Sequence, residues 1–471
     1  MAPATHAAAL LPPSISATSD RSIDTLMPPL LRTPATASVA PAQRDALRAS
    51  LSVSRAFPQV TREFKQFLQA QAQISYATRD ATAKVADQTA FAEMQRYLFN
   101  RYNGLTVLRS VRQGQTVFDC IPREQQPGLR DGSAIATPPP ITAPAANAAA
   151  LPARNVSQRC DAGSVPLKRI GIAELAEHRD LRAFLKAGLP PRSGPQAVTA
   201  PPVYSNHFHA QVALDVDTSS VTGAGADLNL WAPTIRNTDE TQSISQIWIV
   251  GTSAQGKDQT LEAGWQVQPG AGWGSKPIVF IYSTQDGYAT TGCHNLDCAD
   301  FVQISDANVL GVVPSNGYST AGGTQTMMRV EFQRNEDGYW WFGYNNEWIG
   351  YYKAELYSGD LANGRVAYIN AGGETSNNNG KPLTMMGSGK FAASGYRQAA
   401  FQANHFYRDA AMVNHPIKQL YAIGLQNPSC YTLAIAGYTY PYALGAGVTR
   451  TTLSPEMQNG GFYFGGPGCP R

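Results

Sequence analysis

The pattern of hydrophobic and polar positions changes along the chain. From residue 60 to residue 102, helix-forming residues dominate and apolar side chains such as Phe64 and Leu68 recur at spacings of three and four. This periodicity predicts one or two amphipathic helices, ended by Asn103 and Gly104. The run that follows, up to Cys120, has the alternation and composition of a short strand.

Beyond about residue 207 the pattern of apolar and polar residues is different. Short β-favouring runs are separated by Gly, Asn and Asp, and helical periodicity is almost absent until about residue 395. The chain is therefore predicted to be mainly β: an antiparallel β-sandwich of two stacked, lectin-like sheets, preceded by a smaller α+β domain. The clearest predicted strands cover residues 243–251, 278–283, 327–332, 339–344 and 366–371.

With 471 residues, the chain is longer than one hydrophobic core usually organises. Residues 1–56 are rich in Ala and Pro without periodicity, and we expect them to be disordered. The α+β domain spans residues 57–186 and includes a Pro/Ala linker at 134–154. A Pro-rich, exposed linker at 187–203 then precedes the β domain at 204–471.

Charge divides the chain in the same place. Residues 1–200 carry 23 basic and 14 acidic residues, and residues 201–471 carry 14 basic and 20 acidic, so the two parts have net charges of +9 and −6. We expect them to attract each other. The basic residues are scattered singly, which argues against nucleic-acid binding. No stretch approaches 18 apolar residues, which argues against a membrane span.

Six cysteines without a CxxC spacing favour disulfides and an oxidising compartment over a zinc site. Fifteen pairings are possible and the sequence does not resolve them; we expect the pairs that are local in sequence. The first twenty residues lack the basic segment of a signal peptide. We therefore expect a secreted protein, exported with a signal that this chain lacks or by another route. The expected pairs are Cys120 with Cys160, Cys293 with Cys298, and Cys430 with Cys469.

Two predicted strands carry a glutamate. In residues 260–267, alternation puts Leu, Ala, Trp and Val on the core side and Glu262 on a polar side that looks accessible. Glu374 follows Gly372 and Gly373, which leave room for another backbone to approach. An isolated strand glutamate is usually a solvated surface residue, so the pattern alone is weak evidence.

A series of motifs resembles the neprosin family of glutamic peptidases, in the order found in that family. VFDCIPREQQPGL (117–129) is similar to the family's activation domain, and the remaining motifs lie in the β domain. The resemblance covers about residues 100–132 and 205–470. The β-domain motifs are LEAGWQV (261–267), IYSTQDGY (281–288), TGCHNLDCADFVQ (291–303), YWWFGYNNEWIGYY (339–352), NAGGE (370–374), MMGSGKF (385–391) and FYFGGPGCP (462–470).

The resemblance implies a β-sandwich endopeptidase that cleaves after proline, without metal or cofactor, with Glu262 and Glu374 as its catalytic pair. Two neighbouring carboxyl groups share a proton, so one activates water while the other polarises the scissile carbonyl. The sequence does not assign these roles. Because free Glu has a pKa of about 4.3, we expect activity at acidic pH. The expected partners are proline-containing substrates and the chain's own pro-domain, which would inhibit it until acid releases it and the linker at 187–203 is cut.

Other readings stay open at this stage. His207 and His209 share a strand face but no third zinc ligand follows. Asp215 and Asp217, with Gly223, hint at a calcium loop but lack its later bidentate Glu, so an Asp-rich turn is favoured. A sandwich with exposed Trp and paired carboxylates would also suit carbohydrate binding or glycan hydrolysis, and a catalytically inactive binding module is a third possibility.

The remaining candidates are weaker. No GxSxG motif is present and no cysteine looks like a nucleophile. His294 and Asp297 lie between Cys293 and Cys298 and are interpreted as turn residues. The tryptophans of the β domain are expected partly in the core and partly in a cleft floor where proline rings could stack: Trp265, Trp273, Trp340, Trp341 and Trp348.

Overall fold

The computed structural model describes part of the chain. The predicted N-terminal segment 1–56 and the linker at 187–203 lie outside it, so these boundaries stay predictions. The described residues are 61–140, 159–185, 206–218, 221–236, 240–314, 317–378, 380–436, 445–452, 454, 457 and 460–470.

The predicted helical region forms two helices, α3 (Arg62–Gln73) and α4 (Gln88–Tyr102). Each begins at a capping side chain: Thr61 accepts a hydrogen bond from the amide of Phe64 at 3.2 Å, and Asp87 accepts one from Ala90 at 2.9 Å. Helix α4 ends just before Asn103, as the sequence predicts. Apolar faces of both helices pack into the core of the N-terminal domain.

A three-stranded antiparallel sheet completes this domain. The predicted strand up to Cys120 is a hairpin of two strands, and Cys120 is joined to Cys160 by a disulfide with a Cα–Cα distance of 5.5 Å. These helices and strands make the smaller α+β unit that the sequence predicts. Its further elements are β1 (Arg109–Gln113), β2 (Thr116–Pro122), η3 (Arg123–Gln125), η4 (Pro127–Leu129), β3 (Ser164–Lys168), α5 (Ile172–Ala176) and α6 (Leu181–Leu185).

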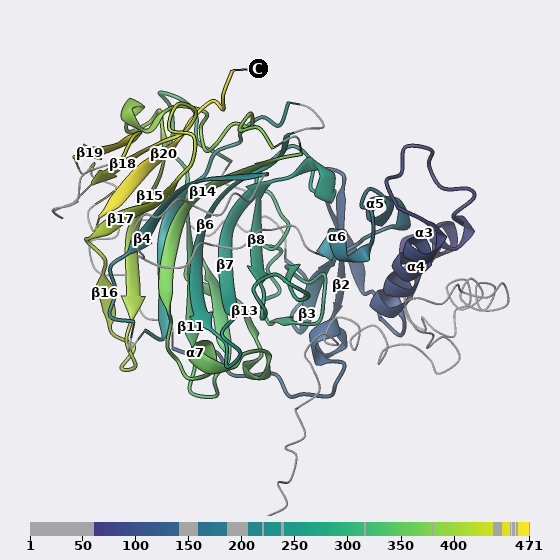
Figure 1. The fold of residues 1–471 in the computed structure, drawn as a ribbon. Coiled ribbons are helices and arrows are strands. Elements are labelled where there is room, and N and C mark those ends of the chain that lie inside the picture. Colours follow the sequence, from purple (N-terminus) through teal and green to yellow (C-terminus); the bar gives the residue numbers. More distant parts are fainter. Residues whose placement is uncertain are drawn as a thin grey trace, which may run out of the picture.

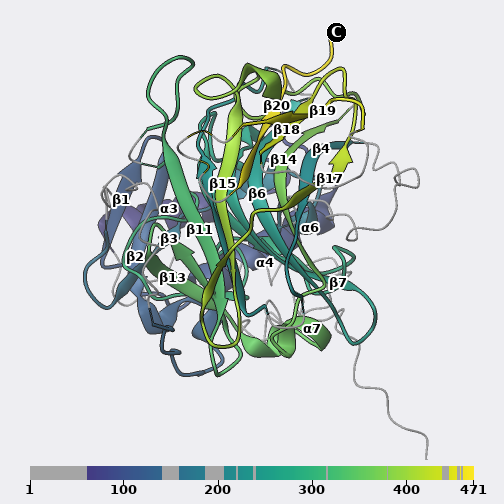
Figure 2. The same ribbon diagram turned by 90° about the vertical axis from the view of Figure 1, so that its left-hand side faces the viewer.

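The rest of the described chain forms two stacked sheets, which confirms the predicted sandwich. Figure 2 shows them as separate layers, with β11 and β15 on the left and β4 and β7 on the right. One sheet has seven antiparallel strands. Their order is β17 (Leu420–Leu425), β4 (His207–Leu214), β14 (Tyr368–Asn377), β6 (Glu240–Thr252), β7 (Asp258–Val267), β8 (Ile278–Ser283) and β9 (Cys293–His294).

The other sheet has ten strands, of which β18 and β19 pair in parallel and the others antiparallel. Strand β16 (Asn414–Pro416) pairs only with β15, off the main order. Short helical turns, η5 (Pro269–Ala271), η6 (Ala354–Leu356), α7 (Gly359–Ala362) and η7 (Ala392–Ser394), connect strands. The main order is β10 (Phe301–Gln303), β13 (Glu347–Tyr352), β12 (Trp340–Tyr344), β11 (Met327–Arg334), β5 (Gly223–Asn229), β15 (Ala400–Arg408), β20 (Gly461–Gly465), β18 (Thr432–Ala436) and β19 (Val448–Thr451).

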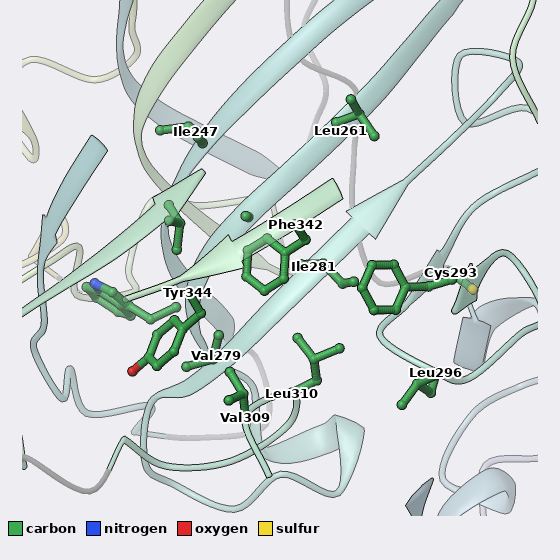
Figure 3. Packing of buried hydrophobic residues seen from close by; sticks show 14 of the residues in the cluster. Ile247, Leu261, Val279, Ile281, Cys293, Leu296, Val309, Leu310, Phe342 and Tyr344 are labelled. Atoms are coloured by element: carbon green, nitrogen blue, oxygen red, sulfur yellow. The ribbon is translucent and has the colours of Figure 1, made fainter. Parts of the chain in front are cut away.

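The core lies between the sheets. Figure 3 shows side chains from both sheets in this core, among them Ile247, Leu261 and Ile281 of the seven-stranded sheet and Phe342 of the ten-stranded sheet. On β7 the predicted alternation holds, because Leu261, Ala263, Trp265 and Val267 are all fully buried in this core. The opposite face of β7, which carries Glu262, is therefore the outer face of the sandwich.

The N-terminal domain packs against one side of the sandwich, where Figure 1 shows α6, β2 and β3 beside β8 and β13. Two buried groups of α4 make the contact: the Tyr97 hydroxyl donates to the carbonyl of Asp297 at 2.6 Å, and Arg101 donates to that of Leu296 at 2.8 Å. Gln126 and Gln303 exchange two hydrogen bonds, at 2.7 and 2.9 Å. Such directed, buried contacts fix the orientation of the domain.

Candidate active site

Glu262 lies in the middle of β7, between β6 and β8. Its neighbours across the sheet are Trp248 and Tyr282. The sequence predicts an accessible polar face here, and this is wrong: the Glu262 side chain is only 3% exposed. Large aromatic residues on the adjacent strands, together with Tyr288 from the loop after β8, enclose the carboxyl group.

One oxygen of Glu262 is held by two hydroxyl groups. Oε1 accepts a hydrogen bond from Thr260 at 2.8 Å and another from the Tyr288 hydroxyl. Burial penalises the charged form more than these hydroxyls stabilise it, and the charge of Glu374 acts in the same direction as burial. Together they raise the pKa of Glu262 to about 8. Glu262 is therefore protonated at neutral and acidic pH.

Glu374 lies on β14 and is also buried, at 1% exposure, which again corrects the expected accessible face. Its Oε1 is 2.6 Å from Nδ1 of His207, and its Oε2 accepts a hydrogen bond from Nε2 of Gln246 at 3.1 Å. Nε2 of His209 lies 3.6 Å from Oε2. The two histidines stand on the same face of β4, as the sequence predicts, but they contact a carboxylate.

Burial alone would raise the pKa of Glu374. The electrostatic interaction with His209 and the hydrogen bond with His207 outweigh it and lower the pKa of Glu374 to about 2. The two carboxyl groups of the predicted pair therefore have pKa values displaced in opposite directions. Glu262 keeps its proton while Glu374 stays ionised over a wide range of pH.

The register places both glutamates on one outer face of the seven-stranded sheet. On β6, which runs between β7 and β14, Glu262 is opposite Trp248 and Glu374 is opposite Ile244. Their charges interact. Within the described residues, the hydrogen bonds of both carboxyl groups go to other side chains rather than to each other.

Two glycines lie between the two glutamates, among residues that pair across the strands of the seven-stranded sheet. Gln246 on β6 has Gly264 and Gly372 as its neighbours across the sheet, and Gln211 lies beyond Gly372. A Cβ atom on either glycine would overlap the neighbouring strand. Both amide atoms of Gln211 and Oε1 of Gln246 are buried without a hydrogen-bond partner among the described residues. The side chains of Gln211 and Gln246 thus place polar atoms between the two carboxyl groups, and these atoms form no hydrogen bond with the described residues.

Sequence reasoning missed several of these groups. The sequence indicates His207 and His209 only as possible zinc ligands, and it indicates no individual role for Tyr288 or Gln246. Tyr288 closes the motif IYSTQDGY and Gln246 stands in the run 243–251. The signal that could have found Gln246 is its phase, because alternation puts it on the side of β6 opposite the apolar Ile247 and Ile249.

The other sequence candidates fall elsewhere. His294 and Asp297 bound a turn, as the sequence predicts, because the amide of Asp297 donates a hydrogen bond to the carbonyl of His294 at 2.9 Å. Both are buried: His294 ends β9 and packs at 5.0 Å, between ring centroids, from Trp273, and Asp297 lies 3.8 Å from Arg101 of the N-terminal domain. Asp215 and Asp217 follow β4.

The candidate tryptophans lie in three different places, and the cysteines form the predicted pairs. Trp265 and Trp340 fill the inter-sheet core, and Trp273 packs near Tyr282 and Tyr288. Trp341 and Trp348 lie on the outer face of the ten-stranded sheet. The predicted pairs Cys293–Cys298 and Cys430–Cys469 are disulfides, as is Cys120–Cys160, which confirms all three pairings.

Three disulfides are compatible with an oxidising compartment. Over the stretches that the structure describes, no helix has both the length and the apolar character that a bilayer crossing needs.

Comparison with known proteins gives a similar solved structure and a family match. Among solved structures, that of Scytalido-glutamic peptidase with a peptide-based transition state analogue is similar over 56% of this chain and 98% of that one, at 8% identity and a TM-score of 0.24. The family model Neprosin matches residues 239–467, a range that contains both Glu262 and Glu374. Residues 239–467 are therefore similar to the neprosin family, and this similarity supports a peptidase activity for the chain.

Proposed function

We propose that this chain is a secreted endopeptidase that hydrolyses peptide bonds, preferentially after proline, with Glu374 as general base and Glu262 as general acid. The observation that carries the proposal is the opposite displacement of the two pKa values, to about 8 for Glu262 and about 2 for Glu374. Pairs of titratable groups with separated pKa values are the usual basis of acid and base roles. The preference for proline rests on the family resemblance.

Glu374 is suited to activate water. Its carboxylate is ionised, and His207 and Gln246 hold its two oxygens in fixed directions. In the proposed first step it takes a proton from water while the water oxygen bonds to the scissile carbonyl carbon. The unused Oε1 of Gln246 is available to accept the second hydrogen of that water. His207 and His209 act as positioning residues that keep the base ionised.

Glu262 is suited to donate. Because its Oε1 already accepts from Thr260 and Tyr288, its proton resides on Oε2. That proton passes to the carbonyl oxygen as the tetrahedral intermediate forms. When the C–N bond breaks, the intermediate returns a proton to Glu262, and Glu374 gives its own to the leaving amine. Both glutamates are then ready for another cycle, and no metal or cofactor takes part.

The N-terminal domain is proposed to be a pro-domain that inhibits the full chain. Its basic side chains pair with acidic ones of the sandwich: Arg101 with Asp297 at 3.8 Å, and Arg159 with Asp306 at 2.6 Å and with Glu347 at 2.7 Å. Protonating these carboxylates at low pH would remove the attraction. Cutting after a proline within 187–203 would then separate the two parts.

The test is a comparison of Glu262→Gln, Glu374→Gln and the double variant on a proline-containing peptide. Each variant is first acidified with a trace of affinity-tagged wild-type chain, which cleaves off the variant's pro-domain and is then removed. A variant that cannot activate itself is thereby distinguished from one that cannot hydrolyse the peptide. We expect each single change to lower kcat by at least ~1000-fold and the double change to cost little more, because the two residues act as a unit. Appreciable activity in either folded single variant would contradict the assignment.

A further inference from the structure

A second surface of the sandwich has the chemistry of a binding site and lies on the other sheet from the glutamates. Trp341, Trp348 and Tyr351, with Tyr339 beside them, form a cluster separate from the inter-sheet core; we refer to it as the aromatic surface. The neighbours of Trp341 on β12, Trp340 and Phe342, belong to the core. Alternation therefore puts Trp341 on the outer face of the ten-stranded sheet, opposite the outer face that carries Glu262 and Glu374.

The aromatic surface is covered by the pro-domain's own proline-rich segment. Residues 131–140, DGSAIATPPP, which we call the covering segment, run into the start of the linker predicted at 134–154. Their side chains Ile135 and Ala136 pack against the aromatic surface. The indole of Trp348 donates a hydrogen bond to the carbonyl of Pro139 at 2.9 Å, and the amide of Ala136 donates to the Tyr351 hydroxyl at 3.1 Å. Under this cover Trp341 and Tyr351 are almost completely buried.

These contacts are those by which proteins bind extended proline-rich chains. Proline has no N–H to donate, so its segment is recognised through its carbonyl oxygens and ring faces, by aromatic side chains with a polar donor. Trp348 supplies such a donor to Pro139. The indole Nε1 of Trp341 is also buried but has no hydrogen-bond partner within the part of the chain described. The aromatic surface thus holds a second donor that the covering segment leaves unused.

We propose that the aromatic surface is a docking site for proline-rich segments of protein substrates, occupied by the covering segment until the pro-domain leaves. This rests on the proposed function, because it requires a peptidase that loses its N-terminal domain. The covering segment is attached to that domain and would depart with it. A substrate chain held there must pass around the sandwich, whose sheets are about 10 Å apart, so only substrates longer than about ten residues could engage both sites.

Binding can be tested without catalysis or activation. In a full-length chain, residues 134–140 are replaced by Gly and Ser of equal length, which removes the proline rings of the covering segment and the Ile135 side chain that packs on the aromatic surface, and Glu374→Gln prevents cleavage of the probe. A fluorescent peptide with the sequence of residues 131–140 is then titrated and followed by anisotropy. We expect saturable binding that Trp348→Phe weakens about tenfold, since the ring stays and the N–H donor is lost.

Trp341→Phe is the matched control, because the N–H it removes makes no bond with this peptide; it should leave the affinity unchanged. Absence of saturable binding, or equal effects of the two substitutions, would overturn the proposal. In the acid-activated wild-type background, Trp348→Phe should raise KM for a proline-rich protein about tenfold and leave KM for a short peptide unchanged. If no substrate is cleaved, the proposed function fails, while the anisotropy result still decides on the docking site.

Discussion

Replacing Glu262 by Gln should stabilise the fold at neutral pH, although it removes a proposed catalytic group. In the folded chain the pKa of Glu262 is about 8, because burial disfavours its charged form, whereas an unfolded Glu has a pKa of about 4.3. At pH 7 the unfolded state has lost a proton that the folded state keeps. Glu262 therefore lowers the free energy of unfolding by up to about 3 to 4 kcal/mol at pH 7.

The effect of Glu262 on stability depends on pH. A carboxyl group whose pKa is raised in the folded state does not change the free energy of unfolding below about pH 4. Above that it lowers the free energy of unfolding by about 1.4 kcal/mol for each pH unit, until about pH 8. Gln is neutral throughout and its amide oxygen can still accept from Thr260 and Tyr288. The gain in stability of Glu262→Gln should thus be about 1 kcal/mol at pH 5 and about 3 kcal/mol at pH 7.

Urea unfolding followed by tryptophan fluorescence at pH 4, 5 and 7 measures this difference. Glu374→Gln is the matched control with the opposite sign. Its folded pKa is lowered to about 2, so the wild-type carboxylate contributes stability above about pH 4 that disappears as pH falls towards 2. The reasoning is refuted if Glu262→Gln is less stable than wild type at pH 7, or if its effect does not change with pH.

Four further expectations follow from the site. Tyr288→Phe removes a hydrogen bond that favours ionised Glu262, so the alkaline limb of the kcat/KM profile should move up by about one pH unit, and a downward shift would count against it. His207→Gln should raise the pKa of Glu374 and move the acidic limb up by a similar amount; an unchanged limb would remove His207 from this role. Acidified wild-type chain should be trimmed within 187–203, as read by N-terminal sequencing, and purified Glu374→Gln should not. EDTA should leave the rate unchanged, whereas zinc-reversible inhibition would revive a metal site at His207 and His209.

The core-facing side of the strands can be predicted from the sequence, because apolar and polar residues alternate along each strand. Leu261, Ala263 and Trp265 are apolar at every second position, and one buried face is enough to fix the strand and its orientation. The two N-terminal helices are readable for the same reason, since their periodicity and the stop at Asn103 are local.

The environment of the glutamates is not readable in this way. Burial of Glu262 depends on Tyr288, which the chain brings from a loop, and the ionisation of Glu374 depends on His207, which is 167 residues away in sequence. Only the pairing of β4 with β14 puts the histidines beside the carboxylate. The same limit applies to Trp341 and Trp348, whose cover comes from the N-terminal domain. Such contacts are set by topology, which alternation does not encode.

In the proposed mechanism Glu262 and Glu374 hydrolyse peptide bonds together. The most direct test is to incubate the acid-activated chain at about pH 5 with a proline-rich protein and to identify the new C-termini by mass spectrometry. The Glu374→Gln variant, whose pro-domain has been removed by tagged wild-type chain, is assayed in the same way. The account predicts termini predominantly at proline with the wild-type chain and none with the variant. Equal cleavage by both, or release of reducing sugar from a glycan without any peptide cleavage, would contradict it.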